Sequence, residues 1–305
     1  MTTATRPSPF MGTTRSTTPT GFHAAIFGAP HGTPYSESDN RVHAAAPDCF
    51  RLALQADAEW LDHWDFDLGG PLLADGECRI ADLGNLPTRS KDGEGNRKLI
   101  EAQTRKILAA GAVPLMFGGD DSTPIPFVAG FSGCSPLTIL QFDAHIDWRD
   151  ERYGERLGFS STMRRASEQA HVWRIVQAGA RGLGSAREAE VRDAKQWGAR
   201  IFTSRQIHHE GLDVVLETIP PDADCLISLD CDALDSSQMP AVAYPSPGGL
   251  SFVQVTDLIA GVAAKARIAG FAMVEFVPKK DLDGTSAFTA ARIAANVIGH
   301  IARQI

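Results

Sequence analysis

Short apolar runs alternate with longer amphipathic segments along most of the chain. Several runs are apolar throughout, which is typical of strands that are buried on both faces of a parallel sheet. Trp64–Leu68 differs because it alternates apolar and acidic residues, and we expect it to be an edge strand or a strand with one solvated face. The predicted strands are Ala24–Gly28, Trp64–Leu68, Val113–Gly118, Leu137–Asp143, Val172–Ala178, Ala199–Phe202, Cys225–Asp230 and Phe271–Phe276.

Helical patterns lie between the predicted strands. Arg97–Ala110 places apolar residues at helical spacing and is followed by Gly111, a typical helix end. Ala186–Trp197 and Val253–Ile268 show similar patterns. Strands that alternate with helices predict βαβ units and therefore an α/β fold.

The chain after its first residues contains no linker, so we expect a single domain over residues 21–305. Residues 1–20 are rich in Thr, Ser and Pro and are expected to form a disordered arm. This arm lacks the apolar segment of a secretory signal. No apolar run reaches the roughly 20 residues of a membrane-spanning helix, so no membrane contact is expected.

Composition narrows the class of protein further. The 305 residues include 37 acidic and 29 basic side chains, which gives a net charge of −8. A hydrophobic content of 43% excludes a disordered chain and is ordinary for a globular protein with a sizeable core. The acidic balance argues against nucleic-acid binding, which needs a basic face. The five cysteines form no CxxC pair, which favours free thiols and a cytoplasmic location.

Acidic residues gather where predicted strands end. Ligands of an open parallel sheet bind beyond the carboxyl ends of its strands, so these side chains are expected to share one site. Carboxylates that lie this close together raise each other's pKa or bind a cation. The strand-end sequences are Gly118-Gly119-Asp120-Asp121-Ser122, Asp143-Ala144-His145-Ile146-Asp147, Asp230-Cys231-Asp232 and Val274-Glu275.

The spacing Asp143-x-His145-x-Asp147 is the most informative of these. On an extended stretch the three side chains point to the same side. Asp and His together favour Mn²⁺, Fe²⁺, Zn²⁺ or Ni²⁺, and more than four ligands indicate two metal ions that generate a hydroxide nucleophile near neutral pH. The alternative for this motif is a solvated loop, and for single acids such as Asp120 and Asp235 it is a helix N-cap. 

Glu275 stands alone inside an apolar run, where a buried carboxylate needs a positive partner. A bound cationic group would be such a partner, and so would a structural arginine.

Together these motifs resemble those of the ureohydrolase family, which includes arginase and agmatinase. The resemblance runs from about Phe22 to Ile305 and rests on Gly118–Ser122, Asp143–Asp147, Ser228–Asp235 with Pro245–Gly249, and Val274-Glu275. It implies a three-layer α/β/α fold, here with a mostly parallel eight-stranded sheet. It also implies two divalent metal ions, usually Mn²⁺ with Ni²⁺ as an alternative, and assembly as a homo-oligomer, a trimer or hexamer.

The resemblance also implies roles for individual residues. Asp147 would manage the proton of the attacking hydroxide, and Glu275 would hold the substrate guanidinium. The implied reaction is cleavage of a C–N bond in a guanidino or amidino compound, with release of urea. The implied metal ligands are Asp121, Asp143, His145, Asp147, Asp230 and Asp232.

The chain departs from the family pattern at three places. Asp121 stands where the family motif GGDHS has His, and an extra anionic ligand should raise the pKa of the attacking water. Phe159 lies near the position of a proton-shuttling His in many relatives, and Ser160, Ser161 or water remain as replacements. The loop Asp235–Pro245 is less glycine-rich than in the family, so known substrates do not transfer.

The leading interpretation is therefore a metal-dependent hydrolase, with agmatine, guanidino acids and biguanide-like molecules as possible substrates. An acidic pocket favours cationic substrates generally. Arg164 or Arg165 is expected either to contact a substrate carboxylate or to form an ion pair on a helix face. Two alternatives stay open, because Asp121 and Phe159 depart from the pattern. In the first alternative the chain is a catalytically degenerate partner subunit of a hetero-oligomeric ureohydrolase. In the second it is a hydrolase of a non-standard amidine.

Overall fold

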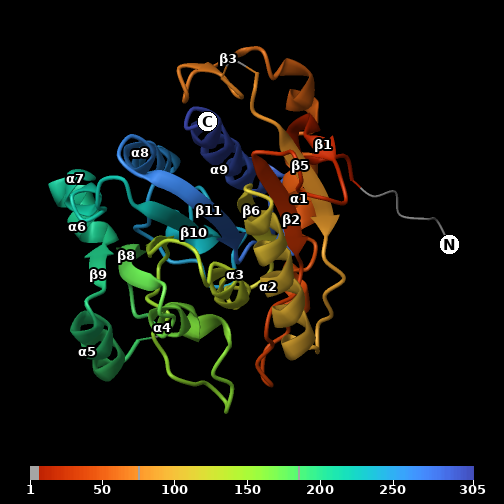
Figure 1. The fold of residues 1–305 in the computed structure, drawn as a ribbon. Helices are drawn as coiled ribbons and strands as arrows, with labels where there is room; N and C mark the ends of the chain where they lie inside the picture. The colour runs from red at the N-terminus through yellow and green to blue at the C-terminus, as the bar shows by residue number, and fades with distance from the viewer. Residues whose placement is uncertain (1–6, 75, 185) are drawn as a thin grey trace.

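A central parallel sheet organises the computed structural model, which describes residues 7–74, 76–184 and 186–305 (Figure 1). Within these residues the sheet has nine strands in the order β1-β5-β2-β6-β11-β10-β7-β8-β9. Every neighbouring pair is parallel. The strands are β1 Thr14–Arg15, β2 Ala24–Ala29, β5 Ile80–Asn85, β6 Val113–Gly118, β7 Leu137–Phe142, β8 Val172–Ala180, β9 Arg200–Thr203, β10 Asp224–Asp230 and β11 Arg267–Val274.

Helices connect the strands and cover the sheet. The α-helices are α1 Ala46–Ala53, α2 Gly93–Ala109, α3 Pro124–Ala129, α4 Thr162–Ser167, α5 Glu188–Trp197, α6 Ser204–Glu210, α7 Asp213–Leu216, α8 Phe252–Ala263 and α9 Thr285–Ala302. Short 3-10 helices occur at Phe10–Gly12, Asn40–His43, Ala56–Trp60, Phe159–Ser161, Cys231–Ala233 and Pro278–Lys280. Among the described residues, no helix is both long and apolar enough to cross a membrane.

Two separate apolar cores make the molecule three-layered. One core contains side chains of α1, α6, α7, α8 and α9, and the other contains side chains of α2, α3, α4 and α5. Strand β10 contributes to both, because successive side chains point to opposite faces: Ile227 lies in the first core and Leu226 in the second. The predicted three-layer α/β/α architecture is confirmed, and the continuous apolar runs are strands buried on both faces.

The strand prediction is wrong in three details. The sheet has nine strands instead of eight, because β1 and β5 were not predicted and one of the eight predicted strands lies outside it. Strand β5 contains Asp82, whose carboxylate is buried 2.8 Å from the Arg51 guanidinium. Polar residues in this strand interrupt the apolar pattern, so the pattern did not predict it. Trp64–Leu68 is not in the sheet: only β3, Trp64–Asp65, is extended, and it forms a two-strand antiparallel pair with β4, Gly70–Pro71.

The described part of the expected disordered arm packs onto the domain. Phe10 is fully buried and contacts Phe117 edge-on, with a ring-centroid distance of 5.1 Å. Strand β1 extends the sheet by pairing with β5. Residues 7–20 therefore do not behave as a free arm, whereas residues 1–6 lie outside the described residues.

Candidate metal centre

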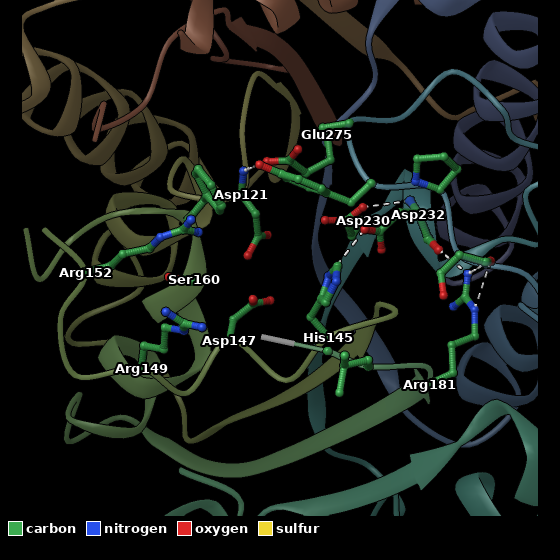
Figure 2. Close-up of a pocket in the computed structure, with 17 residues that line it drawn as sticks. Asp121, His145, Asp147, Arg149, Arg152, Ser160, Arg181, Asp230, Asp232 and Glu275 are labelled. Carbon is green, nitrogen blue, oxygen red and sulfur yellow. Dashed lines mark hydrogen bonds and ion pairs between the residues drawn. The ribbon is translucent and has the colours of Figure 1, made fainter. Parts of the chain in front are cut away.

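The four acidic strand ends belong to four neighbouring strands in the middle of the sheet. Strands β6, β11, β10 and β7 lie side by side and run in the same direction, so their carboxyl ends meet at one edge. A pocket of about 540 Å³ opens there, and Figure 2 shows the acidic side chains turned into it. Six of the predicted site residues line this pocket: Asp121, His145, Asp147, Asp230, Asp232 and Glu275.

Asp143, the seventh predicted residue, joins two groups of potential ligands. Asp143, His145 and Asp232 offer ligand atoms that all lie within 4.8 Å of one another. Asp121, Asp143 and Asp230 form a second such group. Because Asp143 belongs to both groups, the arrangement fits two cations that share a bridging carboxylate.

Burial leaves these carboxylates without adequate solvation. The pKa values of Asp121, Asp143, Asp147 and Asp230 are raised well above their usual range, first by burial and then by neighbouring carboxylates. For Asp121 the repelling neighbours are Asp147, Asp143 and Glu275. A divalent cation would offset both the burial and the mutual repulsion of these carboxylates, since it supplies opposite charge and replaces the lost hydration.

The Asp121 side chain gives the clearest test of whether the residues fit a metal ion. Its Oδ2 atom is buried and has no hydrogen-bond partner among the described residues. Buried polar atoms of this kind cost about 1–3 kcal/mol unless they are satisfied. Together with the two ligand groups, this orphaned oxygen indicates that the site fits divalent metal ions.

A buried amide network positions the ligands of β7. The Gln141 Nε2 atom donates to Asp143 Oδ2 at 2.7 Å and to Asp147 Oδ2 at 2.9 Å. The Gln177 amide in turn donates to Gln141 Oε1 at 2.5 Å and to the Ile146 carbonyl at 2.8 Å. The sequence analysis missed both glutamines, although each is a polar residue near the carboxyl end of a mostly apolar strand.

Glu275 is held by neighbours from other strands. Its Oε1 atom accepts a hydrogen bond from the Asp121 amide at 2.8 Å, and its Oε2 atom lies 3.5 Å from His43 Nε2. Burial raises the Glu275 pKa to about 7, although His43 acts to lower it. The side chain beside the Glu275 carboxylate is therefore a histidine, and no arginine contact is recorded for this carboxylate among the described residues.

Backbone geometry at the site is unusual in ways that fit a functional centre. Asp147 has φ 45° and Glu275 has φ 64°, both in the left-handed region that costs a non-glycine residue about 1–3 kcal/mol. The Glu275 amide donates to the Gly119 carbonyl at 2.8 Å. A Cβ atom at Gly119 would lie 2.4 Å from the Pro30 carbonyl oxygen, so the glycine permits this close approach of strand ends.

Neither Asp120 nor Asp235 is the helix N-cap that the structural alternative predicted, since α3 begins after Thr123 and α8 begins after Ser251. Asp120 Oδ1 accepts the Ser122 amide at 3.0 Å, as a local turn acceptor. Asp235 Oδ2 accepts the Gly248 and Gly249 amides and closes its own loop. Both acids therefore stand outside the two ligand groups.

Arg164 and Arg165 form helix-face ion pairs. Arg165 lies 2.6 Å from Asp150 and 3.1 Å from Glu168, and Arg164 lies 3.3 Å from Asp193. Neither residue lines the pocket. This supports the structural alternative for both arginines.

Further residues outside the predicted ligand set line the pocket. Phe159 lines the pocket at the start of a 3-10 helix, with Ser160 beside it. Ser160 Oγ lies 2.6 Å from the Tyr35 hydroxyl, a buried contact between segments 125 residues apart. Arg149, Arg152 and Arg181 also line the pocket. Their positions in loops gave no periodic signal that could have identified them.

The loop Asp235–Pro245, which departs from the family pattern, contributes residues to the pocket. Tyr244 lines it together with Ala243, Pro245 and Ser246, whereas Met239 is fully buried in a hydrophobic core. Arg181 fixes this loop, since its guanidinium donates to the carbonyls of Ser246 and Asp232.

The fold and site define an α/β protein with a carboxylate-rich pocket that can hold two metal ions. The Arginase family model matches residues 22–299, so the chain belongs to the arginase family. This confirms the resemblance that the motifs indicated. An N(1)-aminopropylagmatine ureohydrolase of Thermus thermophilus is 34% identical over 209 residues, which cover 68% of each chain.

Solved structures agree with this assignment. The agmatine ureohydrolase of Thermoplasma volcanium is 27% identical, has a TM-score of 0.77 and is matched over 92% of this chain and 89% of its own. The proclavaminate amidino hydrolase from Streptomyces clavuligerus has a TM-score of 0.85 with 24% identity and 99% coverage of both chains, which shows the shared fold.

Proposed function

We propose that this arginase-family chain is a binuclear-metal-dependent amidinohydrolase, which cleaves a C–N bond of a guanidino or amidino compound and releases urea. The observation that most supports this function is the pair of ligand groups that share Asp143. Ureohydrolase names among the relatives point to the same reaction.

The proposed metal ligands are Asp121, Asp143, His145, Asp147, Asp230 and Asp232. Carboxylate and imidazole ligands suit Mn²⁺, with Ni²⁺ as the alternative. When bound, two such ions lower the pKa of water and supply a nucleophile near neutral pH. The Gln141 amide orients Asp143 and Asp147 for this task, as outer-shell partners of metal ligands do.

Glu275 is proposed to bind the substrate guanidinium. The carboxylate is buried at the pocket wall. A guanidinium bound there would favour the ionised form of Glu275, because opposite charges attract strongly in a buried site. Asp147 is proposed to accept and return the proton of the attacking water, because its carboxylate lines the same pocket as the other proposed ligands. Phe159 cannot relay a proton. The hydroxyl of Ser160, which is hydrogen-bonded to the Tyr35 hydroxyl, is proposed to relay the proton to the departing amine instead.

A urea-release assay tests this function. Purified chain loaded with Mn²⁺ should release urea from at least one of agmatine, a guanidino acid or a biguanide. The rival proposal is a catalytically degenerate partner subunit. Complete inactivity of the metal-loaded chain alone, with activity only after a paralogous subunit is added, would support that rival. A biguanide or another non-standard amidine as the only substrate would support the second alternative.

We further propose that residues 21–305 act as one catalytic domain in a homo-oligomeric trimer or hexamer. Family membership over residues 22–299 supports the single domain. A cytoplasmic location is proposed because all five cysteines are free thiols. No nucleic-acid partner is proposed, since the chain has net charge −8.

A further inference from the structure

The pocket is lined by acidic side chains and also by three arginines, of which Arg152 is one. Arg152 lies in the loop between β7 and α4, is half-buried and lines the pocket. In Figure 2 its side chain lies apart from Asp230 and Asp232, with the Asp121 carboxylate between them in that view. The pocket therefore has two ends of different charge.

Three aromatic rings hold the Arg152 guanidinium. Its central carbon lies 5.0 Å from the Tyr153 ring centroid, 5.5 Å from Tyr35 and 5.9 Å from Phe159. Tyr35 and Phe159 also pack edge-on at 4.7 Å. Such contacts orient an arginine without neutralising its charge.

The backbone around Arg152 is built to present it. Arg152 and Glu155 exchange two backbone hydrogen bonds of 3.0 Å across a turn. The central residues, Tyr153 and Gly154, have φ 55° and 77°, as in a type I′ turn. A tyrosine in this conformation is strained, and non-glycine strain of this kind clusters at ligand-binding sites.

Arg152 also lacks the anionic partner that nearby arginines have. Among the described residues, no carboxylate lies within 4.0 Å of its guanidinium. Arg156, four residues later, lies 2.9 Å from Asp150. Arg181 is saturated by backbone carbonyls of Ser246 and of the segment that follows β10. Arg152 is therefore a prearranged cation whose donors face the pocket unsatisfied.

We propose that Arg152 binds an anionic group of the substrate, so that the substrate is a guanidino or amidino compound with a carboxylate at its other end. This inference rests on the proposed function. Glu275 and Arg152 then recognise opposite charges at the two ends of one molecule. Phe159 acquires a role as a wall of the aromatic cage, which accounts for a phenylalanine at a position where a proton relay was expected.

The same charge disfavours a substrate with a cationic tail. The ammonium of agmatine would lie near Arg152 and be repelled, whereas a carboxylate accepts two parallel hydrogen bonds from a guanidinium. The general preference of an acidic pocket for cations is thus restricted to its metal-binding end.

Calorimetric binding to the metal-free protein, where no turnover occurs, tests this inference. The probes are 4-guanidinobutyrate and its neutral amide, 4-guanidinobutyramide, which differ in charge at one end. The wild-type chain should bind the acid about 10- to 100-fold more tightly than the amide. Arg152→Gln should abolish this preference with little change in amide affinity, and Arg152→Lys should retain part of it.

Arg156→Gln is the matched control, because Arg156 lies in the same loop outside the pocket, and it should keep the full preference. Equal binding of acid and amide by wild type, or a preference that survives Arg152→Gln, would overturn the inference. Urea release is measured separately. Turnover without an Arg152-dependent preference refutes only the inference, and a preference without turnover refutes only the proposed function.

Discussion

The two walls of the pocket differ in how closely they follow the family motifs. The strand-end wall, formed by the acidic and histidine residues that follow β6, β7, β10 and β11, departs only at Asp121. The loop wall is formed by Arg149, Arg152, Phe159 and Ser160. It has Phe159 near the position where the family pattern has a proton-shuttling histidine. Under the proposed function, this comparison assigns the metal chemistry to the ends of the sheet strands and the variable substrate recognition to a loop.

The physical reason lies in what fixes each wall. Parallel strands hold their carboxyl ends within one edge, and buried glutamines fix the carboxylates further. The loop wall depends on an aromatic cage and one strained turn, which tolerate substitution without disturbing the sheet. Perturbing each wall in turn should therefore give different kinds of defect.

The largest expected effect comes from removing a carboxylate of the strand-end wall. Asp230→Asn should lower urea-releasing turnover by at least about a thousandfold, because it removes an anionic ligand from one of the two groups. Asp222→Asn is the control, since Asp222 is exposed and its φ of 58° suits asparagine. Persistent activity in Asp230→Asn would show that the site assignment is wrong.

The next effect is on stability without metal. Glu275 has a folded pKa of about 7 against an unfolded value of 4.5, so the folded state binds more protons between these values. Its contribution to the free energy of unfolding is complete below pH 4.5 and falls by about 3 kcal/mol as pH rises past 7. The melting temperature of chelator-treated protein should therefore fall between pH 5 and 8.

Two comparisons check this pH effect. Metal-loaded protein should lose less stability over the same range, because cations bind the ionised carboxylates. Glu275→Gln should make the metal-free profile less steep, because only the share of Glu275 is removed and the buried aspartates keep theirs. Stability that rises with pH in the chelated wild type would contradict the account of the strand-end wall.

A smaller effect is expected from the layer behind the ligands. Gln141→Leu removes the amide that donates to Asp143 and Asp147, and it should weaken metal affinity about 10- to 100-fold. Thr138→Val on the same strand is the control, since the Thr138 hydroxyl is buried and has no hydrogen-bond partner among the described residues. Metal affinity is measured by equilibrium dialysis. Equal affinity in the two variants would show that Gln141 does not position the metal ligands.

The smallest effect concerns the one departure on the strand-end wall. Asp121→His removes an anionic ligand, which should lower the pKa of the attacking water and shift the alkaline side of the rate profile downward by up to about one pH unit. Urea release measured across pH tests this shift. An optimum that stays in place or rises would show that the Asp121 charge does not tune the water.

The sequence predicted the strand-end wall of the pocket better than the loop wall. The apolar runs and the acids that end them predicted the central strands and one shared site, because both are local patterns. Strand β5 escaped, since its Asp82 is neutralised by Arg51 from a distant helix. Arg152 and Tyr35 escaped as well, because only tertiary folding brings residues 117 positions apart into contact.

Metal stoichiometry tests the central claim most directly. Equilibrium dialysis of purified chain against Mn²⁺ should give two ions per wild-type chain. Asp143→Asn should reduce this number strongly, because Asp143 belongs to both ligand groups. A wild-type chain that binds no ion or only one, or an Asp143→Asn variant that still binds two with wild-type affinity, would contradict the binuclear site.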